Sequence, residues 1–328
     1  MQINKDNIKN ILVVRNDRLG EFLLNIPALR ALKETFRDAK LIVAVNPALR
    51  ELADNVEYID EVIVWEHGKH SLFEKIRLLK LLRAKNIDMA IMLNPLKDLN
   101  ILTYLAGIPI RVGYDRKMGF LLTHKIEDKK YLGLKHEVEY NLELVSLTGA
   151  ATQDQKLCLP IDEEEIASLL IRFNIGPADN IVALHPWTSD PVKQWPVNNF
   201  CGLATKLIEK LGVTVVIVGG QKESAESKDL FAGMGEKLID LTGQTDLIQL
   251  AQVLKGSKLL ISPDSGPVHL ACAVGTKVLA IFGNDIPGKS PRRWGPWGEG
   301  NMVIQKADLL DITAEEVFEK AQEALGRK

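Results

Sequence analysis

The chain has 328 residues, of which 46% are hydrophobic and 26% are charged, a balance typical of a folded globular protein with about two domains. Lys and Arg number 41 and Asp and Glu number 43, so the formal net charge of −2 argues against a dedicated nucleic-acid-binding protein. The cysteines are far apart, which excludes a disulfide framework and a cysteine-based zinc site and favours a reducing cytoplasmic setting; they are Cys158, Cys201 and Cys272.

The N-terminal segment is polar and lacks the apolar stretch of a secretory signal. The longest apolar runs, such as 213–218, have the length of a strand and fall far short of the ~20 residues that span a bilayer. We therefore expect no membrane-spanning segment, whereas binding to a membrane surface stays open.

In the first half of the chain, short β-rich apolar runs alternate with segments whose apolar residues recur at helical spacing. The pattern predicts strands at 11–15, 40–45, 61–65 and 88–93, and helices at 20–36, 47–53 and 71–85. The second half repeats it, with strands at 180–185, 213–218, 237–240, 258–262 and 277–282 and helices at 197–211, 222–234, 246–255 and 266–274. Strict alternation of strand and helix predicts an α/β fold whose parallel sheets are covered by helices on both faces.

The alternation breaks around 150–180, where a polar segment and one short helix at 162–173 stand between the two halves. We place the domain boundary there, which predicts an N-terminal domain at 1–160 and a C-terminal domain at 161–328. Both are expected to be Rossmann-like and to face each other across a cleft, where ligands bind at the carboxyl ends of the strands. The last helix, at 313–325, starts with a capping box and is expected to pack back on the N-terminal domain.

Several common signatures are absent: the sequence has no G-x-G-x-x-G after the first strand, no Walker-type loop and no G-x-S-x-G elbow. Their absence argues against dehydrogenases, P-loop NTPases and α/β-hydrolases. His67 and His70 lack a third ligand nearby in the sequence, so a solvated loop is favoured over a metal site. Asp264 has no D-x-D partner and has Asp285 as its lone acidic neighbour across the next strand.

A first polar stretch, R-N-D-R-L-G-E-F at 15–22, follows the first strand directly. Gly20 lets the backbone approach a ligand, and Glu21 opens the next helix. A purely structural interpretation explains these residues equally well: Glu21 interacts favourably with the positive end of the helix dipole, and Asp17 and Arg18 form a surface pair.

A second stretch at 185–196 follows the first strand of the C-terminal domain. The hydroxyls of Thr188 and Ser189 together with the ammonium of Lys193 suit a phosphate group. For Trp195, packing in the core is favoured over stacking on a ligand.

A third stretch, S-P-D-S-G-P-V-H at 262–269, ends a strand and starts a helix that Asp264 or Ser265 caps. The amides of Ser265, Gly266 and Val268 would then form an anion site at the helix N-terminus. An ordinary capped helix explains the same residues except His269, which suits a buried, hydrogen-bonded position equally well.

Together these stretches resemble the lipopolysaccharide heptosyltransferases, glycosyltransferase family 9, over residues 11 to about 298. The motifs that carry the resemblance are R-N-D-R-L-G-E-x-x-L-x-x-P-A-L-R, H-P-x-x-x-x-P-V-K-Q-W-P, V-G-G-x-x-E at 218–223, D-S-G-P-x-H-L-A-x-A-x-G-T at 264–276 and W-G-P-W-G at 294–298. The resemblance implies a GT-B fold in which the C-terminal domain holds the nucleotide-sugar donor and the N-terminal domain binds the acceptor.

It also implies transfer of heptose from ADP-heptose to the anionic inner core of lipopolysaccharide, with inversion and without a metal or other cofactor. Such an enzyme is cytoplasmic, and a peripheral position on the inner face of the inner membrane stays open. The alternatives are a GT-B enzyme for another nucleotide sugar or acceptor, and a non-catalytic two-lobed nucleotide-sugar binder, which would not need a carboxylate at Glu21.

The resemblance assigns roles by position in the motifs. Glu21 matches the catalytic acid, where most members carry Asp, a side chain shorter by one methylene. Lys193 matches the basic residue at the donor phosphates, with a catalytic role towards the leaving group, and Glu223 matches the acid near the ribose. The remaining expected donor contacts are Thr188, Ser189, Asp264, Ser265, Gly266 and His269, and the expected acceptor-side residues are Asp17, Arg18 and Gly20.

The segment 69–85 carries six Lys and Arg residues against the single acid Glu74. Its apolar residues Leu72, Ile76, Leu79 and Leu82 line one face of the predicted helix. This composition is typical of a surface-binding helix. For the apolar face by itself, the favoured explanation is a crossover helix that packs this face on its own sheet and exposes its basic side.

Overall fold

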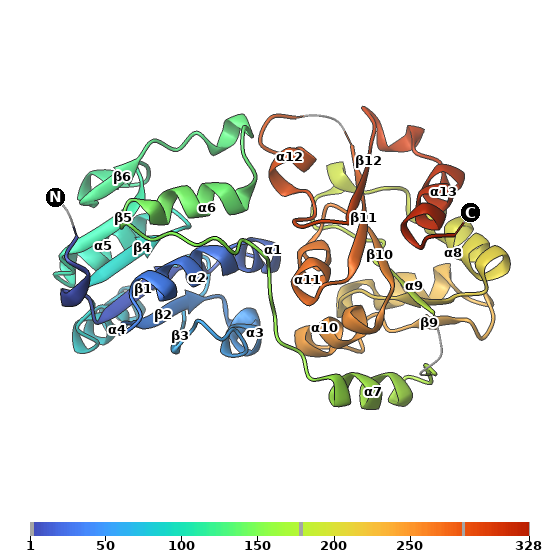
Figure 1. Ribbon diagram of the computed structural model, residues 1–328, viewed down its shortest axis with the longest axis horizontal. Helices are drawn as coiled ribbons and strands as arrows, with labels where there is room; N and C mark the ends of the chain where they lie inside the picture. The colour runs from blue at the N-terminus through green and yellow to red at the C-terminus, as the bar shows by residue number, and fades with distance from the viewer. Residues whose placement is uncertain (1–2, 177–179, 284–285, 328) are drawn as a thin grey trace. The chain divides into compact units, whose positions relative to one another are not determined.

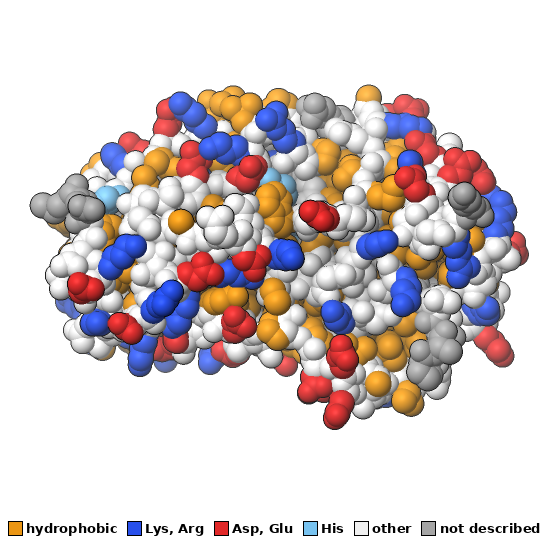
Figure 2. Space-filling model, viewed as in Figure 1, with side chains coloured by type: hydrophobic (Ala, Val, Ile, Leu, Met, Phe, Trp, Pro, Cys, Tyr) orange, Lys and Arg blue, Asp and Glu red, His pale blue; other side chains and the backbone are white. Residues whose placement is uncertain are grey.

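The computed structural model describes residues 3–176, 180–283 and 286–327, and the chain divides into two compact units, Met1–Lys156 and Leu157–Lys328 (Figure 1). Each unit is an α/β domain built on its own six-stranded parallel sheet. On the face seen in Figure 2, basic and acidic side chains are interspersed, in keeping with the near-neutral net charge.

The first sheet has the strand order β3-β2-β1-β4-β5-β6. Its central strands are buried on both faces, as expected for parallel strands between two layers of helices. The order reverses between β1 and β4, where a doubly wound sheet places ligands at the strand carboxyl ends. The strands are β1 (Asn10–Val14), β2 (Lys40–Val45), β3 (Glu61–Val64), β4 (Met89–Met92), β5 (Ile110–Tyr114) and β6 (His124–Ile126).

The helix expected over 20–36 is two helices, because the chain turns at Asn25 and a second helix starts there with proline in its first turn. Proline has no amide hydrogen to donate, so it suits the first turn of a helix and not the interior. The helices of this unit are α1 (Leu19–Leu23), α2 (Ile26–Thr35), α3 (Arg50–Asp54), α4 (Leu72–Ala84), α5 (Lys97–Leu105) and α6 (Glu137–Ser146).

The second sheet has the strand order β12-β11-β10-β7-β8-β9 and repeats the same design. Its strands are β7 (Ile181–Leu184), β8 (Thr214–Ile217), β9 (Leu238–Asp240), β10 (Leu259–Pro263), β11 (Lys277–Phe282) and β12 (Met302–Gln305). Its helices are α7 (Glu163–Arg172), α8 (Val197–Leu211), α9 (Ser224–Leu230), α10 (Leu247–Gly256), α11 (Gly266–Val274), α12 (Pro291–Trp294) and α13 (Ala314–Ala324).

Helix α13 belongs to the second unit. Its apolar residues Val317, Phe318 and Ala321 are buried in the core formed by this unit's own sheet and α8. The apolar face of α13 is thus used within the second unit, and packing of the last helix on the N-terminal domain stays a prediction. Among the described residues, no helix is both long enough and apolar enough to cross a membrane.

Candidate active site

A partly buried cluster of polar side chains joins the ends of β7 and β10 in the second unit. His185 directly follows β7, and its Nδ1 lies 3.1 Å from Ser262 Oγ and 3.2 Å from Ser265 Oγ. The two hydroxyl oxygens are 2.8 Å apart. Burial lowers the pKa of His185 to about 4, so the imidazole is neutral at pH 7 and holds the two serines without adding charge.

Ser265 is the N-cap residue of α11, but its hydroxyl makes no hydrogen bond to the helix. It is directed instead to His185 and Ser262, so Ser265 holds the predicted N-cap position without capping the helix through its side chain. The Val268 amide donates to the Ser265 carbonyl at 3.3 Å, so it is already used within the turn. Of the three amides expected to bind an anion, that of Val268 is therefore not open, while the positive end of the helix dipole still lies at Gly266.

Lys193 and Asp264 come together at the same end of the sheet. Lys193 Nζ lies 2.6 Å from Asp264 Oδ2, and the two side chains are 25% and 9% exposed. They line a pocket together with Lys289 and Phe282, and Lys289 Nζ lies 3.6 Å from the Asp190 carboxylate. The pocket thus combines two lysines with Asp264, just before α11, and with the carboxyl end of β11, the strand that follows α11.

The loop that carries Lys193 is held by its own polar groups. The Thr188 hydroxyl donates to the Asp190 carbonyl at 2.9 Å and accepts from the Asp190 amide at 3.0 Å. Gln194 ties the loop together: its Oε1 accepts from the Thr188 amide at 3.1 Å, and its Nε2 donates to the Trp195 carbonyl at 2.8 Å. Thr188 thus shapes the loop, and the exposed Ser189 lies beside it.

Gln194 was not among the predicted site residues. The motif P-V-K-Q-W-P contains it, but nothing in the sequence shows that its side-chain amide joins Thr188 to Trp195 and so holds the loop together. Trp195 is fully buried and donates to the Ile312 carbonyl at 2.9 Å. Its predicted position in the core is confirmed.

The V-G-G motif after β8 packs tightly against the loop after β7. A Cβ at Gly219 would lie 2.7 Å from the ring of Trp187, and one at Gly220 would lie 2.9 Å from Glu223 Oε2. At Gly219, where the neighbour is a buried ring, only glycine lets the chain pass this closely. Glu223 itself is partly exposed at the start of α9, and His269 is buried one turn into α11.

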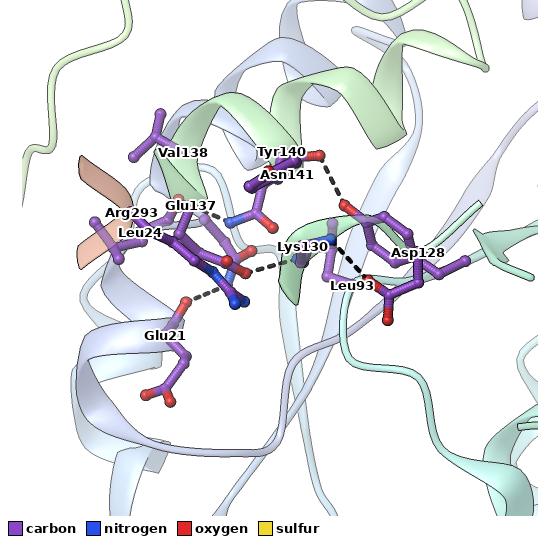
Figure 3. Close-up of polar contacts among 12 residues, drawn as sticks. Glu21, Leu24, Leu93, Asp128, Lys130, Glu137, Val138, Tyr140, Asn141 and Arg293 are labelled. Carbon is purple, nitrogen blue, oxygen red and sulfur yellow. Dashed lines mark hydrogen bonds and ion pairs between the residues drawn. The ribbon is translucent and has the colours of Figure 1, made fainter. Parts of the chain in front are cut away.

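In the first unit, the loop after β1 is anchored by a buried arginine. Arg15 Nε lies 2.9 Å from Asp17 Oδ1, and its Nη2 lies 3.5 Å from Glu137 Oε1. Glu137 also pairs with Lys130, whose Nζ is 2.6 Å away, and Figure 3 shows these two side chains pointing toward each other. Asp17 is therefore the partner of a buried arginine, although that arginine is Arg15 and not its neighbour Arg18.

Glu21 lies in α1, partly buried, and the pKa of its carboxyl is raised. Burial is the main cause and the negative charge of Asp17 adds to it, while Arg15 and Arg18 act in the opposite direction. Gly20 is buried in the same helix, and Arg18 is exposed at its start. The carboxyl group of Glu21 is thus more basic than that of an ordinary glutamate.

Three residues near this loop were missed by the sequence analysis: Lys130, Glu137 and Asn141. Glu137 is 1% exposed, and the Asn141 amide donates to the Leu24 carbonyl at 3.2 Å, at the turn between α1 and α2 (Figure 3). They lie more than 100 residues along the chain from the β1 loop, and no local pattern links them to it.

His70, one of the two histidines considered as a metal pair, contacts a tryptophan ring and a backbone carbonyl. His70 stacks on Trp65 with 3.7 Å between the ring centroids, and its Nε2 lies 2.9 Å from the Glu66 carbonyl oxygen. No group of three or more His, Cys, Asp or Glu side chains within residues 3–176, 180–283 and 286–327 is arranged to hold a metal ion. Asp285, the acidic neighbour expected for Asp264, lies outside the described residues.

The profile of glycosyltransferase family 9 (heptosyltransferase) matches residues 75–321. The chain belongs to this family of glycosyltransferases. It is 25% identical to lipopolysaccharide heptosyltransferase 2 of Salmonella typhimurium, over 97% of this chain and 99% of that protein. It is 26% identical to lipopolysaccharide heptosyltransferase 3 of Escherichia coli, over 87% of this chain and 84% of that protein.

Solved structures of this family share the fold. The chain superposes on E. coli ADP-heptose lps heptosyltransferase II with a TM-score of 0.83, 24% identity and coverage of 96% of this chain and 98% of the other. A structure of E. coli heptosyltransferase WaaC with ADP gives a TM-score of 0.77 at 22% identity, covering 96% and 99% of the two chains. The fold is therefore the GT-B fold of these heptosyltransferases, as the sequence motifs predict.

Proposed function

We propose that this glycosyltransferase transfers heptose from ADP-heptose to the inner core of lipopolysaccharide, with inversion at the anomeric carbon and without a metal ion. The observation that carries the proposal is the meeting of Lys193, Asp264 and the N-terminus of α11 at one end of the second sheet. A positive charge next to a helix N-terminus is suited to a diphosphate. Relatives of this family have been solved with ADP and with ADP-2-deoxy-2-fluoro heptose, which supports an ADP-sugar as the donor.

In the proposed reaction, the second unit binds the donor and the first unit binds the acceptor. Glu21 takes the proton from the acceptor hydroxyl, whose oxygen attacks the anomeric carbon of the heptose. The bond from that carbon to the diphosphate oxygen breaks, and ADP leaves with the bonding electron pair. Lys193 and the positive end of the α11 dipole stabilise the charge that builds up on the diphosphate.

The surroundings of Glu21 suit a general base. Its raised pKa brings the carboxylate closer to the range in which a base is effective near neutral pH, whereas Asp17 is tied to Arg15 at 2.9 Å. Asp17 is then a positioning residue that holds the loop. In the donor site, Glu223 is assigned to the ribose, and Thr188, Ser189, Ser265, Gly266 and His269 to the remaining donor contacts.

The decisive experiment measures ADP release from ADP-heptose with and without a heptose-deficient lipopolysaccharide core acceptor. Acceptor-dependent release supports the proposal. Release that requires a different nucleotide sugar, tested in parallel, would assign another donor. Tight binding of ADP-heptose with no release under any acceptor would leave the non-catalytic binder as the explanation.

A further inference from the structure

Helix α4 presents two different faces. Leu78 and Leu82 are 5% and 2% exposed and pack into the core of the first unit. At 100° per residue, Phe73, Arg77 and Lys80 lie on the side of the helix opposite these two leucines. Leu72 and Ile76 were predicted to share one face with Leu82. They are exposed instead, because only the second half of the helix is buried by apolar neighbours.

The first turns of α4 carry three large apolar side chains in solvent. Leu72 is 74% exposed, Phe73 is 76% exposed and Ile76 is 42% exposed. We refer to these three residues as the apolar tip. A capping box fixes the start of the helix: the Glu74 amide donates to Ser71 Oγ at 3.3 Å, and the Glu74 carboxylate accepts from the Ser71 amide at 2.7 Å. The apolar tip is thus held outward by an ordered helix end.

The basic side chains in and next to α4 also fall into two groups, those held by neighbouring elements and those on the outward face. Lys75 pairs with Asp98 at 2.7 Å, and Arg83 donates to the Leu105 carbonyl at 2.8 Å. Lys85, the C-cap residue that follows the helix, pairs with Glu61. Arg77 and Lys80 are exposed on the outward face, and no carboxylate in the described part of the chain pairs with them. Glu74 is held by the capping box. The outward face therefore combines the apolar tip with uncompensated positive charge.

This combination favours one kind of occupant. A second copy of the chain docking through the same face would bring two positively charged surfaces together, which is unfavourable. An anionic bilayer satisfies both features, because apolar side chains enter the acyl boundary while cations remain at the phosphate headgroups. We propose that the outward face of α4 docks on membranes that contain anionic phospholipids.

The biological role of this docking rests on the proposed function, because a lipopolysaccharide acceptor is anchored in a membrane. Docking itself is measured without donor or acceptor. The intact protein is sedimented with vesicles of phosphatidylglycerol and phosphatidylcholine over a range of salt concentrations. We expect binding that requires phosphatidylglycerol and weakens with salt, because the cations contribute through screened electrostatic attraction.

Two double variants test the two features separately. Leu72→Ser with Phe73→Ser removes the most exposed apolar side chains, and Arg77→Glu with Lys80→Glu reverses the charge. Each is expected to weaken partition onto the vesicles at least tenfold, since each removes one of the two contributions to interfacial binding. All four positions are exposed, so the thermal midpoint of each variant should stay within about 2 °C of the parent, as exposed substitutions change stability little.

Matched controls lie in the second unit. Ile171→Ser with Leu310→Ser removes two apolar side chains that are 64% and 72% exposed, and Arg172→Glu with Lys228→Glu reverses two exposed cations. These controls should bind vesicles as the parent does. Equal binding by all five proteins, or no binding by the parent, would overturn the proposal, as would a lipid-free dimer that the Leu72 and Phe73 substitutions abolish. Failure of acceptor-dependent ADP release would reject the proposed function while leaving the vesicle result intact.

Discussion

Replacing Lys193 by Met tests the donor site directly, because it removes the ammonium group and keeps an unbranched side chain. Lys193 is 25% exposed and lies 2.6 Å from Asp264, which is only 9% exposed. Loss of a charge-assisted contact to a phosphate costs about 1.5–3 kcal/mol. At about 1.4 kcal/mol per factor of ten, this corresponds to roughly a 10- to 150-fold weaker affinity for ADP.

The surroundings of Lys193 place the expected loss of ADP affinity in the upper part of the roughly 10- to 150-fold range. Without Lys193, the carboxylate of Asp264 loses its ion pair with that ammonium group and faces the incoming diphosphate as a like charge. The unliganded protein should lose about 1 kcal/mol of stability, because the ion pair is only partly buried.

Lys206→Met is the matched control. Lys206 Nζ lies 2.5 Å from Glu315 in the same unit, in an ion pair between α8 and the residues of α13, with side chains 30% and 49% exposed. This pair lies away from the pocket lined by Lys193, so the control should bind ADP within about twofold of the parent, as expected for an independent surface pair.

Calorimetric titration with ADP measures the affinities, and thermal unfolding gives an independent check. At an ADP concentration of 100 times the parent's Kd, the ligand stabilises the parent by about 2.7 kcal/mol and a tenfold weaker variant by only about 1.4 kcal/mol. If Lys193→Met and Lys206→Met both bind ADP as the parent does, Lys193 does not contact the donor phosphates and its ion pair with Asp264 is purely structural.

Four further predictions concern the base, its neighbour Asp17, the metal and His185. Glu21→Gln should lower kcat by about 100- to 10,000-fold with ADP affinity unchanged, and near-normal turnover would place the base elsewhere. Asp17→Asn removes a negative charge that raises the pKa of Glu21, so the acidic limb of the kcat–pH profile should move to lower pH; an unmoved limb would contradict this electrostatic coupling. Dialysis against EDTA should leave turnover unchanged, and activity that EDTA abolishes and magnesium restores would refute metal independence. The pKa of His185 is about 4 in the folded protein, below its ordinary value of 6.5, so the unfolded chain binds more protons in that interval and stability should fall as the pH drops from 6.5 to 4. Urea titrations of the parent and His185→Gln check this, since the variant should lose that part of the pH dependence.

Local pattern alone was enough to predict most of the central secondary structure. The strands at 40–45 and 277–282 and the helices at 197–211 and 266–274 have the predicted bounds, because an apolar run or a continuous helical period marks each of them. The internal strand β5, the edge strands β6 and β12, and the helices α5, α6 and α12 were missed. The two edge strands are three and four residues long and only partly buried, so they lack such a run. The break at Asn25 was missed as well, since apolar residues continue at helical spacing through it.

For the site, the sequence determined which loops carry polar chemistry, because each motif directly follows a predicted parallel strand and the carboxyl ends of such strands meet at one edge of a sheet. Which side chains touch was decided by the tertiary structure. Lys193 meets Asp264, Ser265 turns from its helix toward His185, and Arg15 meets Glu137. These partners are separated by 71 to 122 residues along the chain. Hydrophobic period and helix-capping preferences act over a few neighbouring residues, whereas these contacts form only when the packed sheets bring distant loops together.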